Sequence, residues 1–182
     1  SELIRDHNFR AIYGNWAYLK TYLRDKYGKY KLAYLSYNAG KRESYRLVGD
    51  VLLTETDIRC KVNYPDAIVT TTWGIDLHYP DKQNSRYFPG QEFIAYAIHP
   101  NKRKEDYTFP YRCLYSRNIE NLFMAGRNIS VTHIALGAIR VQRTTGMMGE
   151  VVGMAAYLCM KYRCSPRQLY TDYLQELLDC VS

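Results

Sequence analysis

Residues 121–162 constrain the fold of this chain more than any other stretch. They begin with an apolar run at 122–125, which has the length and composition of a buried strand, and the run breaks at Gly126. A polar turn follows, and small and apolar residues then dominate over 141–162, which predicts a helix. Small residues give this helix one slim side for close backbone packing: Gly146, Gly149, Gly153, Ala155 and Ala156. The N–H groups at the start of such a helix suit an anionic or electron-rich ligand group.

Composition indicates an ordinary globular protein and excludes several other classes. Hydrophobic residues make up 47% and charged residues 24% of the 182 residues. No apolar run reaches the roughly 18 to 20 residues of a membrane span. The net charge of +7 is scattered, with one compact cluster at 102–104, and no nucleic-acid-binding motif is present. A solvated basic loop accounts for that cluster better than nucleic-acid binding does.

The sequence alone does not decide the roles of the cysteines and tyrosines. Cys60, Cys113, Cys159, Cys164 and Cys180 contain no C-x-x-C pair and are odd in number. This pattern favours free, mostly buried thiols over a zinc site or a disulfide framework, so we predict no metal site. The 19 tyrosines suit a sugar-binding surface, but they suit interfaces and half-buried sheets equally well.

Outside the central stretch, the periodicity predicts helices at both ends and strands between them. Residues 2–27 form an amphipathic pattern that ends at Gly28. Thr54 and Asp57 approximate a capping box, and Ser165 followed by Pro166 marks the start of a last helix. Strands are expected at 32–37, 45–53, 68–73, 73–78, 92–99 and 109–115.

The central stretch resembles a known family. The runs NLFMAGRNIS, THIALGAIRV and TTGMMGEVVGMAA resemble the C-terminal, cofactor-closing segment of FAD-dependent oxidoreductases related to the succinate dehydrogenase and fumarate reductase flavoproteins. The chain looks most like the bacterial subgroup known as the FAD-dependent oxidoreductase family. Three upstream segments, RESYRLVGDVLLTETDI, WGIDLHYP and FPYRCL, also resemble family segments in family order. The resemblance covers about residues 41–162 and implies FAD as the cofactor.

One family feature is missing from the sequence. No G-x-G-x-x-G occurs, although this element holds the ADP half of FAD and would precede the matching segments. The first residue is Ser1 and not Met. We therefore expect the C-terminal part of a longer flavoprotein that needs a missing N-terminal FAD-binding half as its partner.

The expected architecture is mixed α/β with three parts. An N-terminal helix spans 1–29, a strand-rich substrate or cap region spans 30–115, and the closing strand and helix of an incomplete FAD-binding domain span 116–182. By itself, this chain is expected to bind FAD poorly or not at all and to be inactive.

The resemblance implies a set of residues near the flavin. In the family, the Ala-Gly-Arg strand end lies beside the flavin and the following helix points its N-terminus at the isoalloxazine and ribityl groups. The expected cofactor-binding residues are Ala125, Gly126, Arg127, Ser130, Thr132, Arg143, Thr144 and Gly146. A cation here would stabilise the negative charge that develops when the ring accepts a hydride.

Four residues are candidates for catalysis: Asp76, His78, His133 and Arg140. Asp76 and His78 are two apart and would share one face of a strand, either as a proton-handling pair or as a structural hydrogen-bonded pair. His133 alone is more often a core or cap histidine. Arg140 and Arg143 are three apart and would form a two-cation site on one helical face, unless they pair with acidic residues such as Glu150.

The family resemblance also implies residues that contact the substrate. Arg42, Arg46 and Arg112 lie in segments that adjoin the active-site region of the family. For Arg42 and Arg46 the alternative is a surface ion-pair group on a strand edge.

The function that the resemblance implies is hydride transfer between an organic substrate and FAD. The first alternative is a non-redox module that binds a sugar or another ligand, or assists assembly, on a flavoprotein scaffold. A carbohydrate lyase is the second, with Tyr79, His78 and Arg86 close in sequence. A small-molecule substrate is expected in each case, with carbohydrate as one class. The sequence leaves the compartment open between cytoplasmic and exported, and it identifies neither the electron acceptor nor the oligomeric state.

Overall fold

The structure is a computed structural model that describes residues 2–38, 40, 43–80, 86, 95–98 and 106–181, with the backbone alone at 79–80 and 95–98. The chain forms two compact units, and each is described by itself. The first unit comprises Ser1–Arg42 and Pro80–Ala95, and the second comprises Glu43–Tyr79 and Tyr96–Ser182. Arg42 and the basic residues at 102–104 lie outside the described residues.

In the first unit, the described residues up to 38 form helix α1 (Glu2–Tyr22), helix α2 (Arg24–Tyr27) and a following segment without regular structure. The predicted single helix is interrupted at Leu23, and Gly28 ends α2 as expected. Lys20 Nζ donates to the carbonyls of Gly28 and Tyr30 at 2.6 and 3.0 Å, which satisfies backbone groups beyond the helix end. The strand predicted at 32–37 is wrong, because the described residues offer these residues no pairing strand.

The second unit contains a regular antiparallel pair of strands. Strand β1 (Ala67–Thr71) pairs with β4 (Tyr107–Pro110), with Val69 opposite Phe109. Strands β2 (Leu77–Pro80) and β3 (Ala95–Ile98) form a second two-stranded sheet. The β-branched run predicted as a strand is therefore β1. The strand expected at 109–115 ends early, because the chain turns into a short 3-10 helix, η2 (Tyr111–Cys113).

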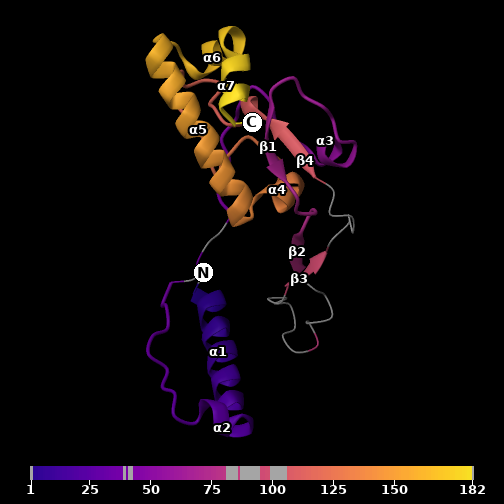
Figure 1. Cartoon of the computed structure of the whole chain (residues 1–182). Helices are drawn as coiled ribbons and strands as arrows, with labels where there is room; N and C mark the ends of the chain where they lie inside the picture. The colour runs from indigo at the N-terminus through magenta and orange to yellow at the C-terminus, as the bar shows by residue number, and fades with distance from the viewer. Residues whose placement is uncertain are drawn as a thin grey trace. The chain divides into compact units, whose positions relative to one another are not determined.

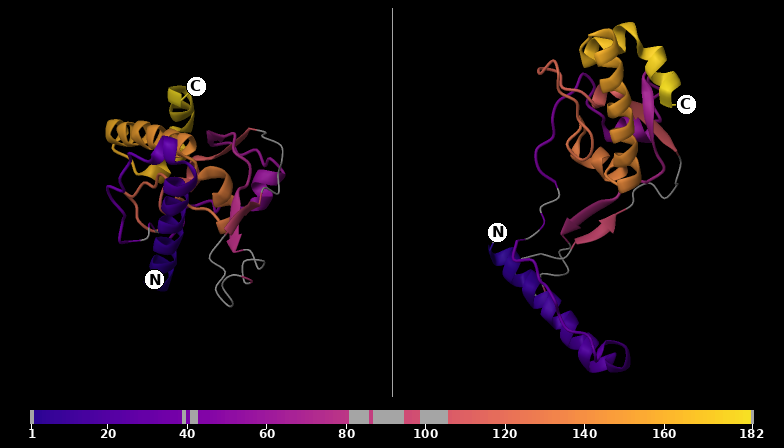
Figure 2. Two further views of the ribbon diagram at one scale, coloured as in Figure 1. Left: turned by 90° about the horizontal axis from the view of Figure 1, so that it is seen from below. Right: turned by 60° about the vertical axis from the view of Figure 1, so that its left-hand side comes forward.

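Among the described residues, five α-helices complete the second unit (Figure 1). They are α3 (Glu55–Arg59), α4 (His133–Ile139), α5 (Gln142–Tyr162), α6 (Pro166–Asp172) and α7 (Leu174–Val181). Helix α5 packs on β1, and both α6 and α7 pack against α5, as the two orientations in Figures 1 and 2 agree. The predicted capping box is present at α3, and α6 begins as predicted with Ser165 as its cap and Pro166 in its first turn. A second capping box, between Ser165 and Gln168, was not predicted. None of the helices among the described residues combines the length and apolar character that crossing a lipid bilayer requires.

An irregular network of backbone hydrogen bonds replaces two predicted strands. Leu47 N–H donates to Asn128 O at 3.0 Å, Leu53 N–H donates to Ser130 O at 3.1 Å, and Thr132 N–H donates back to Leu53 O at 2.9 Å. These bonds produce one parallel bridge instead of a continuous ladder. The strand predicted at 45–53 is therefore wrong, because the segment bends at 50–51.

The strand predicted at 122–125 is also wrong. Its single antiparallel bridge joins Phe123 to Tyr115, and Met124 N–H donates to Leu114 O at 2.7 Å. Met124 is buried, whereas Ala125 is exposed. The apolar composition indicated burial correctly for part of the run, but four residues with one bridge do not make a ladder.

A buried ion pair fixes the start of β1 to η2. Asp66 is fully buried and accepts from Arg112 Nε at 3.0 Å, from Arg112 Nη2 at 2.8 Å and from the Arg112 backbone N–H at 2.9 Å. The guanidinium also lies over the ring of Tyr170, 4.7 Å from its centroid. Arg112 therefore joins the strand pair to α6.

We predict that Arg112→Ala lowers the free energy of unfolding by about 3 to 5 kcal/mol, because it leaves the Asp66 carboxylate buried without its cation. The matched control is Arg59→Ala, which removes an exposed ion pair with Glu55 and should cost less than about 1 kcal/mol. Urea unfolding monitored by circular dichroism measures both. Equal losses in the two variants would contradict a special role for the buried pair.

Candidate functional site

Helix α4 presents two polar ends on one side. Thr132 caps it, with its Oγ1 accepting from Ala135 N–H at 3.5 Å, and the helix ends at Arg140. His133 and Arg140 are seven residues apart, which is about two turns, so both lie on the same face roughly 10 Å apart along the axis. The residues between them are mostly buried in the core. Each polar end has its own set of charged neighbours.

The first set, the N-terminal cluster, consists of Glu43, Arg46 and His133. His133 Nδ1 lies 2.8 and 2.9 Å from the two carboxylate oxygens of Glu43, and Arg46 forms an ion pair with the same carboxylate. Burial works to raise the pKa of Glu43, but the hydrogen bonds from His133 and Arg46 outweigh it and lower that pKa. The cluster is half open, since His133 keeps 54% of its side-chain surface exposed. It can bind an anion or hold a proton next to solvent.

The second set, the C-terminal cluster, consists of Asp76, His78 and Arg140. His78 Nε2 lies 3.2 Å from Asp76 Oδ1, and Arg140 Nη2 lies 3.4 Å from Asp76 Oδ2. Arg140 also donates to the Asp76 backbone carbonyl at 3.3 Å. The carboxylate thus lies near both a guanidinium and an imidazole. The strand predicted at 73–78 begins only at Leu77, so Asp76 lies just before it and the two residues do not share one strand. Asp76 is mostly buried, while His78 keeps 46% of its side-chain surface exposed.

Gly137 allows the second cluster to form. A Cβ at this position would lie 2.7 Å from the Asp76 carbonyl oxygen and 3.1 Å from its nitrogen. Those separations are shorter than van der Waals contact, so the Asp76 backbone can lie against α4 only where the helix carries no side chain. This close approach brings the Asp76 carboxylate to Arg140, one turn further along the helix.

The bend at Gly126 and the start of α5 form a third polar area. Gly126 has a φ of +105°, a conformation that favours glycine, and its N–H points to Met148 Sδ at 3.2 Å. The first turn of α5 has no side-chain cap at Val141 and contains no acidic residue, and Arg143 there is exposed. The N–H groups of this turn therefore offer donors to an electron-rich group.

Three predicted site residues make contacts inside the fold. Ser130 is fully buried, and its Oγ lacks a hydrogen-bond partner within the described part of the chain. Thr144 Oγ1 donates to Thr71 Oγ1 at 3.3 Å, and Thr71 Oγ1 donates to the Ala138 carbonyl at 2.7 Å, so Thr144 belongs to an interior hydrogen-bond chain. Arg112 is held by Asp66.

The predicted two-cation site on one helical face is wrong, because a helix boundary separates the two arginines. Arg140 ends α4, whereas Arg143 belongs to the first turn of α5, so the two do not share a helical face. The spacing was correct for a continuous helix, but the chain leaves the helical conformation at Val141, where φ is −74° and ψ is 148°. Arg140 instead pairs with Asp76.

The sequence prediction missed two residues that build the site. Glu43 joins Arg46 to His133 across 90 residues of sequence, and only its i, i+3 spacing from Arg46 gave a local signal. Gly137 was not singled out, although a glycine inside a helical run marks a place where another backbone approaches closely. Its partner, Asp76, could not be identified from spacing.

Comparison with known proteins identifies the family. The model of the FAD dependent oxidoreductase family matches residues 2–178. The chain belongs to that family. No curated protein and no solved structure matches the chain.

The residues of this family member fit one part of FAD. The uncapped first turn of α5, the exposed Arg143 and the open backbone at Gly126 fit an electron-rich edge of the flavin and its linker. The element that holds the ADP half in dinucleotide sites, G-x-G-x-x-G, does not occur in the 182 residues. Among the described residues, His, Cys, Asp and Glu do not gather in a group that could hold a metal ion.

We predict that Gly137→Ala destabilises this FAD dependent oxidoreductase by about 1 to 3 kcal/mol, since the new methyl group forces the Asp76 backbone away from α4. The control is Gly146→Ala in α5, where a Cβ would meet no atom within 4 Å. That change should stabilise the helix by up to about 1 kcal/mol through helix propensity. Thermal unfolding compares the two, and a stabilising Gly137→Ala would refute the close contact.

The N-terminal cluster generates a pH prediction. Because the pKa of Glu43 is lowered by folding, its stabilising contribution is present above the unfolded carboxyl pKa and is lost as the pH falls through the folded value. The difference in unfolding free energy between the wild type and Glu43→Gln should therefore be present at pH 6 and shrink below about pH 4. Urea titrations across this range measure it, with the exposed Glu120→Gln as control. A difference that widens in acid would contradict the assignment.

Proposed function

We propose that this chain supplies catalytic side chains and the segment that closes the flavin site of an FAD-dependent oxidoreductase. Such an enzyme moves a hydride between an organic substrate and FAD. The observation that carries the proposal is the C-terminal cluster. It holds an imidazole, a carboxylate and a guanidinium together on a half-open face of α4. The family match supports flavin chemistry, and the position of this cluster at the start of the α4–α5 junction supports its use in that chemistry.

FAD, when bound, supplies the two-electron acceptor for a hydride taken from a substrate C–H bond. The contribution of His78 is to hold and move a proton. Its Nε2 faces Asp76, which leaves Nδ1 as the nitrogen that exchanges a proton with a substrate hydroxyl or amine. The Asp76 carboxylate lies beside the ring, 3.2 Å from Nε2, while Arg140 fixes Asp76 through both its side chain and its carbonyl.

The N-terminal cluster is proposed to bind the acidic part of a substrate. Arg46 and His133 both contact Glu43, so a substrate carboxylate would exchange with Glu43 or add to this group of cations. Its position on the same face of α4, roughly 10 Å from the C-terminal cluster, fits a substrate that is long enough to reach both clusters.

Arg127, Arg143 and the first turn of α5 are proposed to face the electron-rich edge of the cofactor, with Ala125 and Gly126 beside it. Thr132 and Gly146 flank this area, at the start of α4 and on the open side of α5 respectively. We further propose that the chain is related to the bacterial relatives of succinate dehydrogenase and fumarate reductase flavoproteins. We also propose that a Gly-rich segment outside these 182 residues binds the ADP half of FAD.

The test uses the protein that contains these 182 residues together with the Gly-rich segment. Arg143→Ala should raise the dissociation constant for FAD about tenfold or more, as expected for a lost charge-assisted hydrogen bond. Arg163→Asn removes a cation about 30 Å away at the other end of α5 and should leave that constant unchanged. Fluorescence quenching of FAD measures both.

Under anaerobic conditions, His78→Asn should slow substrate-driven bleaching of the flavin absorbance by about 10²-fold or more without weakening FAD binding. The 182-residue chain alone should retain little flavin. Failure of the longer protein to bind FAD, or unchanged flavin reduction in His78→Asn, would reject the proposal.

A further inference from the structure

The end of α5 brings two cysteines together. Arg163 follows the helix in the left-handed conformation, with φ 52° and ψ 44°, and Cys164 N–H then donates back to the Cys159 carbonyl at 3.0 Å. The Arg163 N–H donates to the same carbonyl. This way of ending a helix folds the residue after the left-handed position back onto the last turn, where the two side chains meet. In most proteins that contact is between apolar residues, and here both members carry a thiol.

The two cysteines are neighbours and remain reachable. The helix end places Cys164 against the last turn that carries Cys159, with the backbone of one hydrogen-bonded to the backbone of the other. Both residues are half-buried and pack on the edge of the hydrophobic core, whereas Cys113 is fully enclosed and Cys60 and Cys180 are exposed. A small oxidant therefore has access to a pair of neighbouring cysteines.

The backbone around the pair is held in place from both sides. Tyr162 stacks on Tyr173 with ring centroids 3.9 Å apart and planes 6° apart. Glu176 of α7 accepts from Lys161 Nζ at 2.7 Å and from the Tyr162 hydroxyl at 2.5 Å. The contacts between α5 and α7 visible in Figures 1 and 2 therefore fix the last turn that carries Cys159.

We propose that Cys159 and Cys164 form an oxidation site, at which hydrogen peroxide converts the two thiols into an intramolecular disulfide that staples the end of α5. One thiol is oxidised by peroxide to a sulfenic acid with release of one water, and the second thiol then displaces the hydroxyl as another water. Two S–H bonds and one O–O bond break, and one S–S bond and two O–H bonds form. The disulfide joins two residues whose backbones the helix end already holds side by side.

The two thiols share the two steps. Burial, together with the neighbouring thiol, raises the pKa of Cys159. The thiolate is the form that attacks peroxide, and whichever cysteine is attacked first, the other lies beside it to complete the disulfide. The inference is independent of flavin binding, since neither cluster on α4 takes part.

Trypsin provides a direct readout. Lys161 and Arg163 lie between the two cysteines, so digestion after Arg143, Lys161, Arg163 and Arg167 places them on separate peptides, 144–161 and 164–167. A disulfide joins these two peptides into one species that dithiothreitol separates. The experiment uses the folded protein with Cys60→Ser and Cys180→Ser, which removes the two exposed thiols and leaves three.

Peroxide treatment of this native protein should lower the thiols that titrate after denaturation from three to one and should produce the joined peptide in most molecules. Cys164→Ser and Cys159→Ser should each abolish the joined peptide, and a dimedone probe should capture a sulfenic acid on the member of the pair that remains. The joined peptide should also form without loss of the native circular dichroism spectrum. A joined peptide that appears only after unfolding, or over-oxidised Cys164 without any joined peptide, would overturn the proposal.

Discussion

The contact between the Asp76 backbone and Gly137 is the constraint on which the site depends. Without a side chain at this position, helix α4 and the segment before β2 approach to a separation that any Cβ would prevent. The same contact brings the Asp76 carboxylate near both Arg140 and His78. Packing and chemistry are therefore coupled at one residue, because a change that loosens the helix also separates the charged groups.

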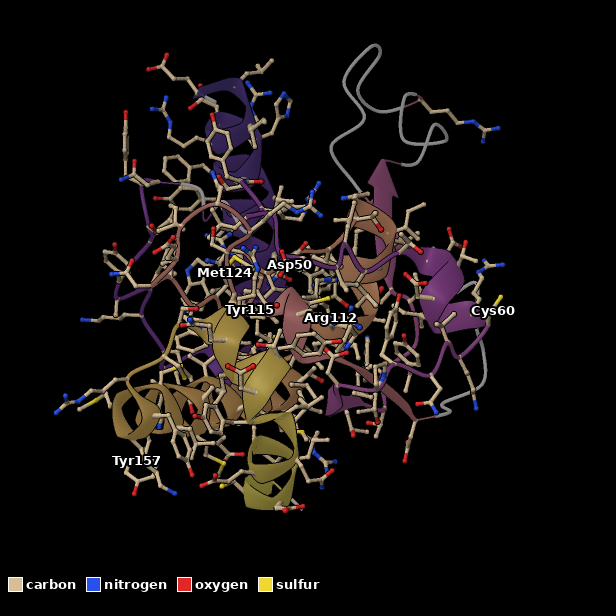
Figure 3. The ribbon with its side chains drawn as sticks, turned by 90° about the horizontal axis from the view of Figure 1, so that it is seen from above. Asp50, Cys60, Arg112, Tyr115, Met124 and Tyr157 are labelled. Carbon is tan, nitrogen blue, oxygen red and sulfur yellow. The ribbon has the colours of Figure 1, made fainter. Side chains whose placement is uncertain are left out.

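The irregular backbone network performs the corresponding task at the other end of α4. It holds the segment 47–53 against 112–117 and 128–132, and this places Glu43 and Arg46, just before that segment, beside His133. Asp50 strengthens the arrangement, since it accepts from the Tyr115 hydroxyl at 2.8 Å and from Arg167 of α6 at 2.6 and 2.7 Å (Figure 3). The loop is thus tied to both the core and the C-terminal helices, although it contains no regular strand.

The sequence predicted the features that depend on neighbouring residues. Local spacing predicted the start and end of α5, the capping box of α3, the cap and first-turn proline of α6, and strand β1, and the structure has them. The failures concern features that depend on distant partners. Extended segments at 32–37 and 45–53 look like strands in composition, but a strand also requires a neighbour with which to form a ladder. The strand predicted at 73–78 begins only at Leu77, although Asp76 and His78 do lie close together. The burial of Ser130 and Thr144 could not be predicted, because a motif records which residues occur together and not which of them face inward.

The two sides of α5 provide a further argument about function. One side is buried through Thr144, Met148, Val151, Ala155 and Leu158. The other carries Gly146, Gly149 and Gly153, where a Cβ would meet no atom within 4 Å, and ends in the exposed Tyr157, which points outward in Figure 3.

Each glycine inside a helix costs about 1 kcal/mol relative to alanine, so three on one open face weaken α5 by about 3 kcal/mol. Packing among the described residues does not require any of them, in contrast to Gly137. The cost is explained if a flat ring or another backbone lies against this face in the complete enzyme, which is the arrangement that the proposed flavin site requires.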